Sequence, residues 1–381
     1  MRSFDGTITW LRFRMDLRQA PPSFWLLLGE CTSAVRHLMG VPLPATEVRV
    51  LEHELLAMGL HARLAMDGST LTLDQIKQHL KGRLRLPPSQ EGYQLEADGL
   101  LYTWQRIAAE SARPKALDPD LVRSFHASLL ETTVDADDRG EWRTVEQGTA
   151  VTDGVPAEMI PLFTDELCDW LSSNELAPPS REDRAAYALL HALIAELYLA
   201  WIRPFGTAHA RISGSVVQHI VLSAGLHPAV GHLISSHFHH SGRTYQHQLE
   251  QAARGTSDPI PFITYGLHGL SQGLADLLLR IREIQIGGLW TAHLVDLFEH
   301  PDQDPERRQR QLLTDLADND GPVPLSGLAR LSATLAKVYA GVSEKTLRRD
   351  VDALEAMGTI LRGPEGFTVR REGLRGFKYP K

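Results

Sequence analysis

The feature that most constrains this chain of 381 residues is a pair of apolar helical stretches joined by a short loop. The first stretch, 184–201, carries large apolar side chains at intervals of three and four residues, which places them on one wide face of a helix. Pro204 and Gly206 end this helix, and a second amphipathic helix is expected over 212–224. The pattern favours a mostly α fold.

The loop, residues 202–214, reads Ile-Arg-Pro-Phe-Gly-Thr-Ala-His-Ala-Arg-Ile-Ser-Gly. Backbone N–H groups at the start of the second helix lack helical partners, and the helix dipole is positive there, so the place favours anions. Guanidinium groups hold phosphates and carboxylates well. We therefore predict an anion- or nucleotide-binding site made of Arg203, Phe205, His209 and Arg211. In the alternative, Arg211 pairs with an internal acid and the pocket is a filled remnant.

The loop resembles that of the Fic family (Fic/Doc, AMP-transferring proteins), His-Pro-Phe-x-Asp/Glu-Gly-Asn-Gly-Arg-x-x-Arg between two helices. Pro204, Phe205 and Arg211 match this pattern. Weaker likeness continues through 232–237 and 245–262. The resemblance implies a Fic-like helical bundle with a short β flap, which we expect over 145–155. Two interpretations of the flap stay open: an edge that binds a target segment by strand addition, or an inert edge.

The chemically important loop positions differ from the family pattern. Arg203 replaces the catalytic histidine, Thr207 the metal-holding acid, Ala208 and Ala210 the glycines, His209 the asparagine, and Gly214 the second arginine. A guanidinium does not deprotonate in proteins, so it cannot act as a general base. A neutral hydroxyl is a weaker magnesium ligand than a carboxylate, and alanine disfavours positive φ angles. We therefore predict that ordinary AMP transfer is lost.

A different enzyme chemistry stays open, with Arg203, Thr207 and His209 as the candidate residues of the degenerate loop and ATP or another nucleotide with Mg²⁺ as the cofactor. The family also carries a self-inhibiting segment whose glutamate pairs with the second loop arginine. Asp67 stands at the corresponding place here, and Gly214 offers it no side chain. The resemblance thus implies that the inhibitory contact was lost together with the activity. The alternative is that Asp67 and Gly68 simply end a helix.

Composition narrows the class of protein. Only two cysteines are present, which suits a reducing compartment, and the N-terminus shows no apolar signal core, so we expect a cytoplasmic protein with no membrane partner. Four histidines cluster within 232–240, but no cysteine or carboxylate joins them, so helix packing is favoured over a metal site. An apolar stripe within 262–298, with a break expected at Gly287 and Gly288, fits either core packing or the seam of a homodimer.

The C-terminal stretch has a different charge from the rest of the chain. Residues 322–381 contain eleven Lys/Arg and six Asp/Glu, a net charge of +5, whereas the whole chain carries −8. Helices are expected over 325–338 and from Ser343 to Met357, followed by a two-strand wing. Lys345, Arg348 and Arg349 lie on the outer side of the second helix. This looks like a winged helix-turn-helix that binds duplex DNA.

We therefore expect an N-terminal helical region at 1–115, a Fic-like core at 116–300, a linker at 301–320 and a winged helix-turn-helix at 321–381. The favoured function is a degenerate Fic-fold protein that regulates through DNA and senses a nucleotide or other anion. Two alternatives stay open: an enzyme with altered chemistry that acts on a nucleotide or carboxylate substrate, and an interaction scaffold.

Overall fold

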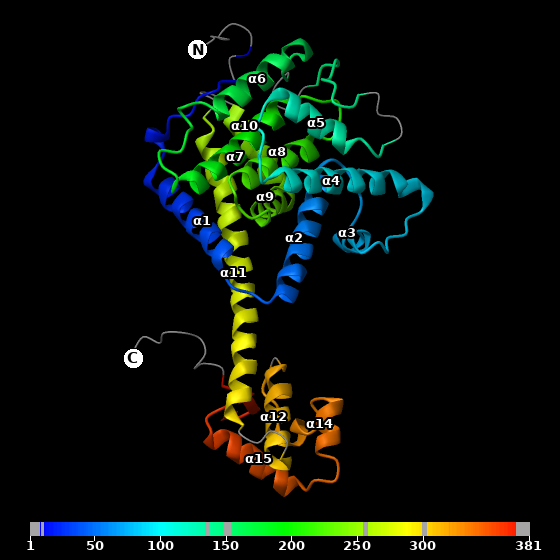
Figure 1. Cartoon of the computed structure of the whole chain (residues 1–381), viewed down its shortest axis with the longest axis vertical. Coiled ribbons are helices and arrows are strands. Elements are labelled where there is room, and N and C mark those ends of the chain that lie inside the picture. The colour runs from blue at the N-terminus through cyan, green and yellow to red at the C-terminus, as the bar shows by residue number, and fades with distance from the viewer. Residues whose placement is uncertain are drawn as a thin grey trace. The chain divides into compact units, whose positions relative to one another are not determined.

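The computed structural model describes residue 8 and residues 11–133, 138–147, 154–253, 258–298, 303–319 and 321–370. It divides into a larger unit, Met1–Leu278, and a smaller unit, Leu279–Lys381. Helices dominate both units, which confirms the mostly α fold (Figure 1). The expected border at residue 115 is absent, because the helices on both sides of it belong to one unit.

In the larger unit, every element of regular secondary structure among the described residues is a helix. Its helices are α1 Pro22–Gly40, α2 Ala45–Met66, α3 Leu73–Leu80, α4 Glu91–Glu110, α5 Pro119–Leu129, α6 Ile160–Leu171, α7 Arg184–Ile202, α8 His209–Ser223, α9 Ala229–His240, α10 Gly242–Ala253 and the first part of α11 Ile260–Leu297, with 3₁₀ turns at Leu17–Gln19, Pro88–Gln90 and Ala157–Met159.

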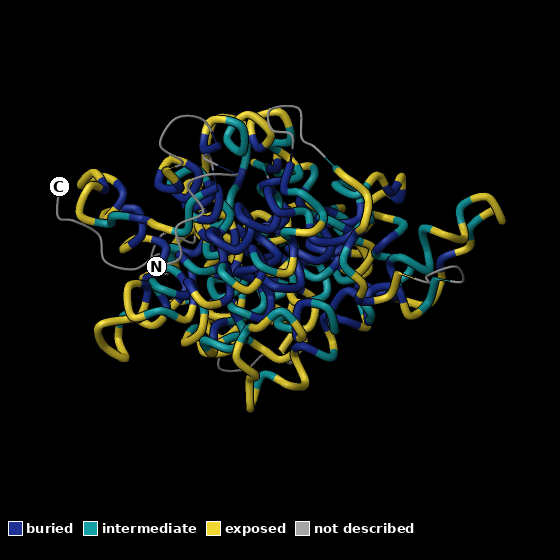
Figure 2. The backbone as a smooth tube through the Cα atoms, turned by 90° about the horizontal axis from the view of Figure 1, so that it is seen from above, coloured by how far each residue is buried: buried dark blue, intermediate teal, exposed yellow. Residues whose placement is uncertain are grey.

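Helix α7 forms the centre of the larger unit. It is apolar around most of its circumference, and a helix of that kind has to be enclosed by others. Helix α8 packs along it, and Figure 2 shows the buried segments gathered in the interior with exposed segments around the edge. By length and composition α7 is apolar enough to cross a membrane, and 72% of its apolar window is buried inside the protein.

The described residues of the smaller unit form the last part of α11, four further helices and a hairpin. These elements are α12 Asp304–Ala317, α13 Leu325–Leu328, α14 Ala333–Val338, α15 Glu344–Ala356, β1 Ile360–Gly363 and β2 Gly366–Val369. The two strands are antiparallel, with Ile360 opposite Val369. Ser343 caps α15 by accepting a hydrogen bond from the Thr346 N–H group, as its place in the sequence predicts.

Two boundaries differ from the sequence-based expectation. The stretch 301–320 is not a linker: most of it is α12, whose Leu312, Leu313 and Leu316 are buried in the core of the smaller unit. Helix α11 continues through Gly287 and Gly288 without a break. A charged surface with one apolar stripe is typical of an amphipathic helix, which explains why composition alone suggested a linker.

The predicted β flap at 145–155 contains no strand in its described residues, and 148–153 lie outside the described residues. The apolar stripe of α11 packs within the single chain, since Leu270, Leu274 and Leu277 are buried there. The stripe therefore gives no support to a homodimer, which stays a prediction.

Candidate functional site

The loop between α7 and α8 borders a cavity of about 860 Å³ in the larger unit. Four predicted site residues line it, namely Arg203, Thr207, His209 and Arg211. The end of α2 and helix α10 supply further walls, including Asp67 and Tyr245. The structure thus brings the predicted loop residues together around one space.

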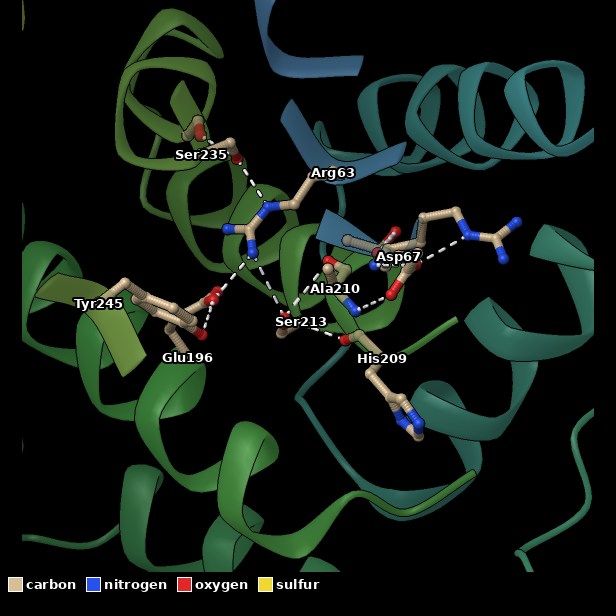
Figure 3. Close-up of polar contacts among 11 residues, drawn as sticks. Arg63, Asp67, Glu196, His209, Ala210, Ser213, Ser235 and Tyr245 are labelled. Atoms are coloured by element: carbon tan, nitrogen blue, oxygen red, sulfur yellow. Dashed lines mark hydrogen bonds and ion pairs between the residues drawn. The ribbon is translucent and has the colours of Figure 1, made fainter. Parts of the chain in front are cut away.

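The anion position at the start of α8 is filled by the carboxylate of Asp67 (Figure 3). Its Oδ1 atom accepts a hydrogen bond of 2.7 Å from the Ala210 N–H group, and Oδ2 accepts one of 3.1 Å from the Arg211 N–H group. The Arg211 Nε atom donates a third, of 2.9 Å, to Oδ2. Ala208 stands at the N-cap position of α8 and has no side-chain acceptor. Asp67, which directly follows α2, therefore caps α8 in its place.

This arrangement corrects the expectation that the inhibitory-like contact was lost. Asp67 lacks a partner at Gly214, but it pairs with Arg211, and the two side chains are only 6% and 4% exposed. The Arg211 Nη2 atom also lies 3.5 Å from Glu96, whose pKa is raised by burial and by the nearby Asp67. The internal-acid interpretation of Arg211 is therefore the one that the structure supports.

Gly214 stands where the family pattern has its second arginine, and the side chain of Arg63, from α2, occupies that space. A Cβ atom at Gly214 would lie 2.6 Å from the Arg63 Nε atom. Arg63 is fully buried and its Nη1 atom donates a hydrogen bond of 2.8 Å to the carboxylate of Glu196, which also accepts one from the Tyr245 hydroxyl (Figure 3). Ser235 accepts a hydrogen bond from Arg63 Nε.

Sequence reasoning missed this role of Arg63. The available signal was a charged side chain between alanine and leucine in an apolar part of α2, because a buried arginine needs an acidic partner.

Phe205 is not part of the cavity. Its ring is fully buried, stacks on His126 with the ring centroids 3.9 Å apart, and also stacks on Trp142 with the centroids 5.0 Å apart. The prediction that Phe205 contacts an anion is therefore wrong, because an enclosed ring in an aromatic stack cannot reach one.

A second residue that the sequence did not single out positions the loop. The buried Arg143 donates a hydrogen bond of 2.7 Å from Nε to the carbonyl of Arg203, and its N–H group donates one to the carbonyl of Pro204. Two more of its hydrogen bonds reach Val145 and Val155, on either side of the expected flap. Through these hydrogen bonds Arg143 connects the backbone of the loop to the segments on either side of the expected flap.

The loop backbone has two left-handed residues, Arg203 at φ +47° and Ala208 at φ +59°. This left-handed conformation costs free energy for alanine but not for glycine, so the bend at Ala208 is strained. His209 follows the second bend. Burial, reinforced by Arg203, lowers the pKa of its imidazole, and its Nδ1 atom has no hydrogen-bond partner among the described residues.

The clustered histidines of α9 serve helix packing. Nδ1 of His232 lies 2.9 Å from the side-chain amide of Gln218, and burial lowers the pKa of His232 to about 3. His237 packs against Tyr265, and His239 against His61. These contacts place three of the four clustered histidines in packing with neighbouring helices.

In the smaller unit the three predicted DNA-contacting side chains are exposed on α15. Lys345 and Arg349 lie one turn apart and make no ion pair with any described residue, whereas Arg348 donates a hydrogen bond of 2.9 Å to Glu344. The acidic Asp350, on the same helix, is buried and pairs with Arg308 at 2.8 Å. The basic residues after Arg370 lie outside the described residues.

Comparison with known proteins relates this fold to Fic proteins, although no family model matches the sequence. A Fic family protein from Desulfovibrio desulfuricans superposes with a TM-score of 0.54 at 18% identity, over 92% of this chain and 96% of that one. A Fic domain containing signaling protein from Bacteroides thetaiotaomicron gives 0.50 at 18%, over 69% and 97%. Fic-1 from C. elegans gives 0.54 at 18%, over 71% and 74%. The chain therefore has the helical fold of Fic-domain proteins, at a level of identity that shows the fold alone.

Proposed function

We propose that this chain is a regulatory protein with a Fic-like fold that has lost ordinary AMP transfer, and that residues 321–381 form a winged helix-turn-helix that binds duplex DNA. The observation that carries the first part is the carboxylate of Asp67 at the start of α8. An internal anion there uses the N–H groups and the arginine that a bound phosphate would need.

AMP transfer requires a hydroxyl to lose its proton and attack the α-phosphorus of ATP, with pyrophosphate leaving. At the position of the family's histidine stands Arg203, whose guanidinium cannot take that proton. A magnesium nucleotide does not suit the loop either, since Thr207 offers one neutral oxygen and Asp67 is engaged with Arg211. A nucleotide or another anion would therefore have to displace Asp67, which makes this contact the natural point of ligand sensing.

One observation favours a second candidate function, an enzyme with altered chemistry. The His209 imidazole lines the cavity, and its lowered pKa keeps it neutral at pH 7. A neutral imidazole can accept a proton. Transfer of any part of a labelled nucleotide, lost in His209→Ala, would support this candidate over the regulator.

DNA binding is supported by the surface of α15. Lys345 and Arg349 are exposed near its N-terminal end, and the acid between them and the core, Asp350, is neutralised inside the unit by Arg308. The positive charge on this face is therefore less opposed than the sequence suggests. The hairpin of β1 and β2 follows α15 directly, as the wing does in a winged helix.

Fluorescence anisotropy with the full chain and labelled duplex DNA tests this. We expect affinity that falls steeply with salt, and the double change Lys345→Ala and Arg349→Ala should lower the salt slope by about 2 if both side chains contact phosphate. The change Lys81→Ala, which removes an exposed charge from the larger unit, is the matched control and should alter neither quantity. Equal affinity of the double variant and the unaltered protein would contradict the DNA proposal.

A further inference from the structure

A basic segment of the larger unit has no part in the proposed function. Residues 75–90, which span most of α3 and the connection to α4, contain four Lys/Arg and no Asp/Glu, a net charge of +4 in a chain that carries −8. Figure 1 shows α3 and this connection at the edge of the larger unit. A local reversal of charge on an acidic protein favours the approach of an acidic partner.

The end of α3 fixes the direction of this connection. Gly82 has φ +65°, a left-handed angle that glycine adopts without strain. Its N–H group donates a hydrogen bond of 2.8 Å to the carbonyl of His79, and the Arg83 N–H group donates one of 2.9 Å to the carbonyl of Gln78. These are the two hydrogen bonds of a Schellman motif, which ends a helix and sets the path of the residues that follow.

After this turn, residues 83–87 form no helix or strand, and their exposure alternates along the chain. Leu84 is 5% exposed and Leu86 is half-buried, whereas Arg83 and Arg85 are exposed. Alternation with a period of two is that of an extended chain with one face on the protein and the other toward solvent. The buried Leu84 therefore anchors the segment, and two guanidinium groups lie on its outer side.

Most of the positive charge here is not neutralised within the part of the chain that the structure describes. Lys77 lies 3.9 Å from Asp74, but Lys81, Arg83 and Arg85 make no ion pair with any described residue. These three cations lie within five consecutive positions of one exposed connection. The segment therefore presents a compact basic surface to solvent.

The backbone of the segment is also unpaired. The Arg85 guanidinium donates only to the carbonyl of its neighbour Leu84, at 3.2 Å. The N–H groups of Arg85 and Leu86 donate no hydrogen bond to any described residue. An extended segment with unpaired backbone donors can pair with a strand of another chain.

We propose that residues 81–86 bind an extended acidic segment of another protein, with a carboxylate at every second residue. Side chains two positions apart on an extended chain are about 6.6 Å apart, so alternate carboxylates of an extended partner match Arg83 and Arg85. Each guanidinium presents a fork of donors that fits a carboxylate. Duplex DNA has no strand edge to pair with the backbone N–H groups, so the observations favour a peptide.

Fluorescence anisotropy of the full chain at low salt, with a labelled peptide of alternating glutamate and threonine, tests the proposal. The comparison peptide has the same composition in the repeat Glu-Glu-Thr-Thr, where no two glutamates stand two residues apart, and should bind about ten-fold more weakly. The double change Arg83→Gln and Arg85→Gln should weaken binding of the alternating peptide about 100-fold, ten-fold for each charge-assisted hydrogen bond. Arg113→Gln with Arg243→Gln is the matched control, since it removes two exposed arginines elsewhere in the larger unit and should leave the affinity unchanged.

Three results would overturn the proposal. Equal affinity for the two peptides would mean a diffuse attraction of charge without matched spacing. Unchanged binding of the alternating peptide by the Arg83→Gln and Arg85→Gln variant would place the contact elsewhere. Loss of duplex DNA affinity in the same variant would make the segment a phosphate-binding surface. Both double variants change exposed side chains, so their denaturation midpoints should equal that of the unaltered protein.

Discussion

Replacing Asp67 with alanine removes the internal anion from the start of α8. The carboxylate accepts three hydrogen bonds, two from the backbone of Ala210 and Arg211 and one from the Arg211 guanidinium. Breaking a buried ion pair by removing one partner costs about 3–5 kcal/mol. Glu96 remains 3.5 Å from Arg211 and still offers it a negative charge, so we expect a loss of about 3 kcal/mol in the free energy of unfolding.

Urea denaturation gives this loss from the shift in midpoint, and the same variant reports on anion binding. With Asp67 gone, inorganic phosphate can reach the freed N–H groups and Arg211, so it should stabilise the variant and not the unaltered protein. A phosphate concentration 100 times the dissociation constant corresponds to about 2.7 kcal/mol. Asp74→Ala, an exposed change on α3, is the control. A loss below about 1 kcal/mol, or equal phosphate effects on both proteins, would refute the assignment of Asp67.

Three further expectations follow from the loop and the buried histidines. Ala208→Gly should raise the free energy of unfolding by about 0.5–1 kcal/mol, because glycine adopts φ +59° without strain; a lower denaturation midpoint would contradict this. Gly214→Ala should cost about 1–3 kcal/mol by crowding Arg63, whereas Gly206→Ala meets open space and should be neutral in the same denaturation assay. The pKa of His126 is lowered to about 4 by burial and that of His232 to about 3, against an ordinary 6.5, so the unfolded chain takes up protons first as pH falls. Between pH 6.5 and 4 each should therefore remove about 1.4 kcal/mol of stability per pH unit, and His126→Asn should reduce that slope; stability independent of pH there would contradict it.

The helices were largely predictable, because their signals are local. The apolar spacing of 184–201 gives α7, and Ser343 caps α15 as expected. The linker at 301–320 was wrong because α12 is strongly charged, and only its partners in the smaller unit reveal which face it buries. Amphipathic helices with few apolar residues look like linkers when composition alone is considered.

The site was predictable in its members but not in its pairing. Arg203, His209 and Arg211 do gather around one cavity. The approach of Asp67 to Arg211 spans 144 positions of the chain, and the contact of Arg63 with Gly214 likewise depends on how α2 packs on α8. Such long-range contacts leave no periodic signal, and the family pattern assigned Asp67 to Gly214 instead of Arg211.

The loss of AMP transfer is tested most directly with ATP labelled in its α-phosphate, incubated with Mg²⁺ and cell lysate. We predict no covalent label on the chain or on lysate proteins, and none in Asp67→Ala, since freeing the anion position leaves Arg203 where the base would have to be. Changing Arg203, Thr207, Ala208, His209 and Ala210 together to the family residues is the positive arm. Label transferred by the unaltered protein, and lost in Arg203→Ala, would contradict the account.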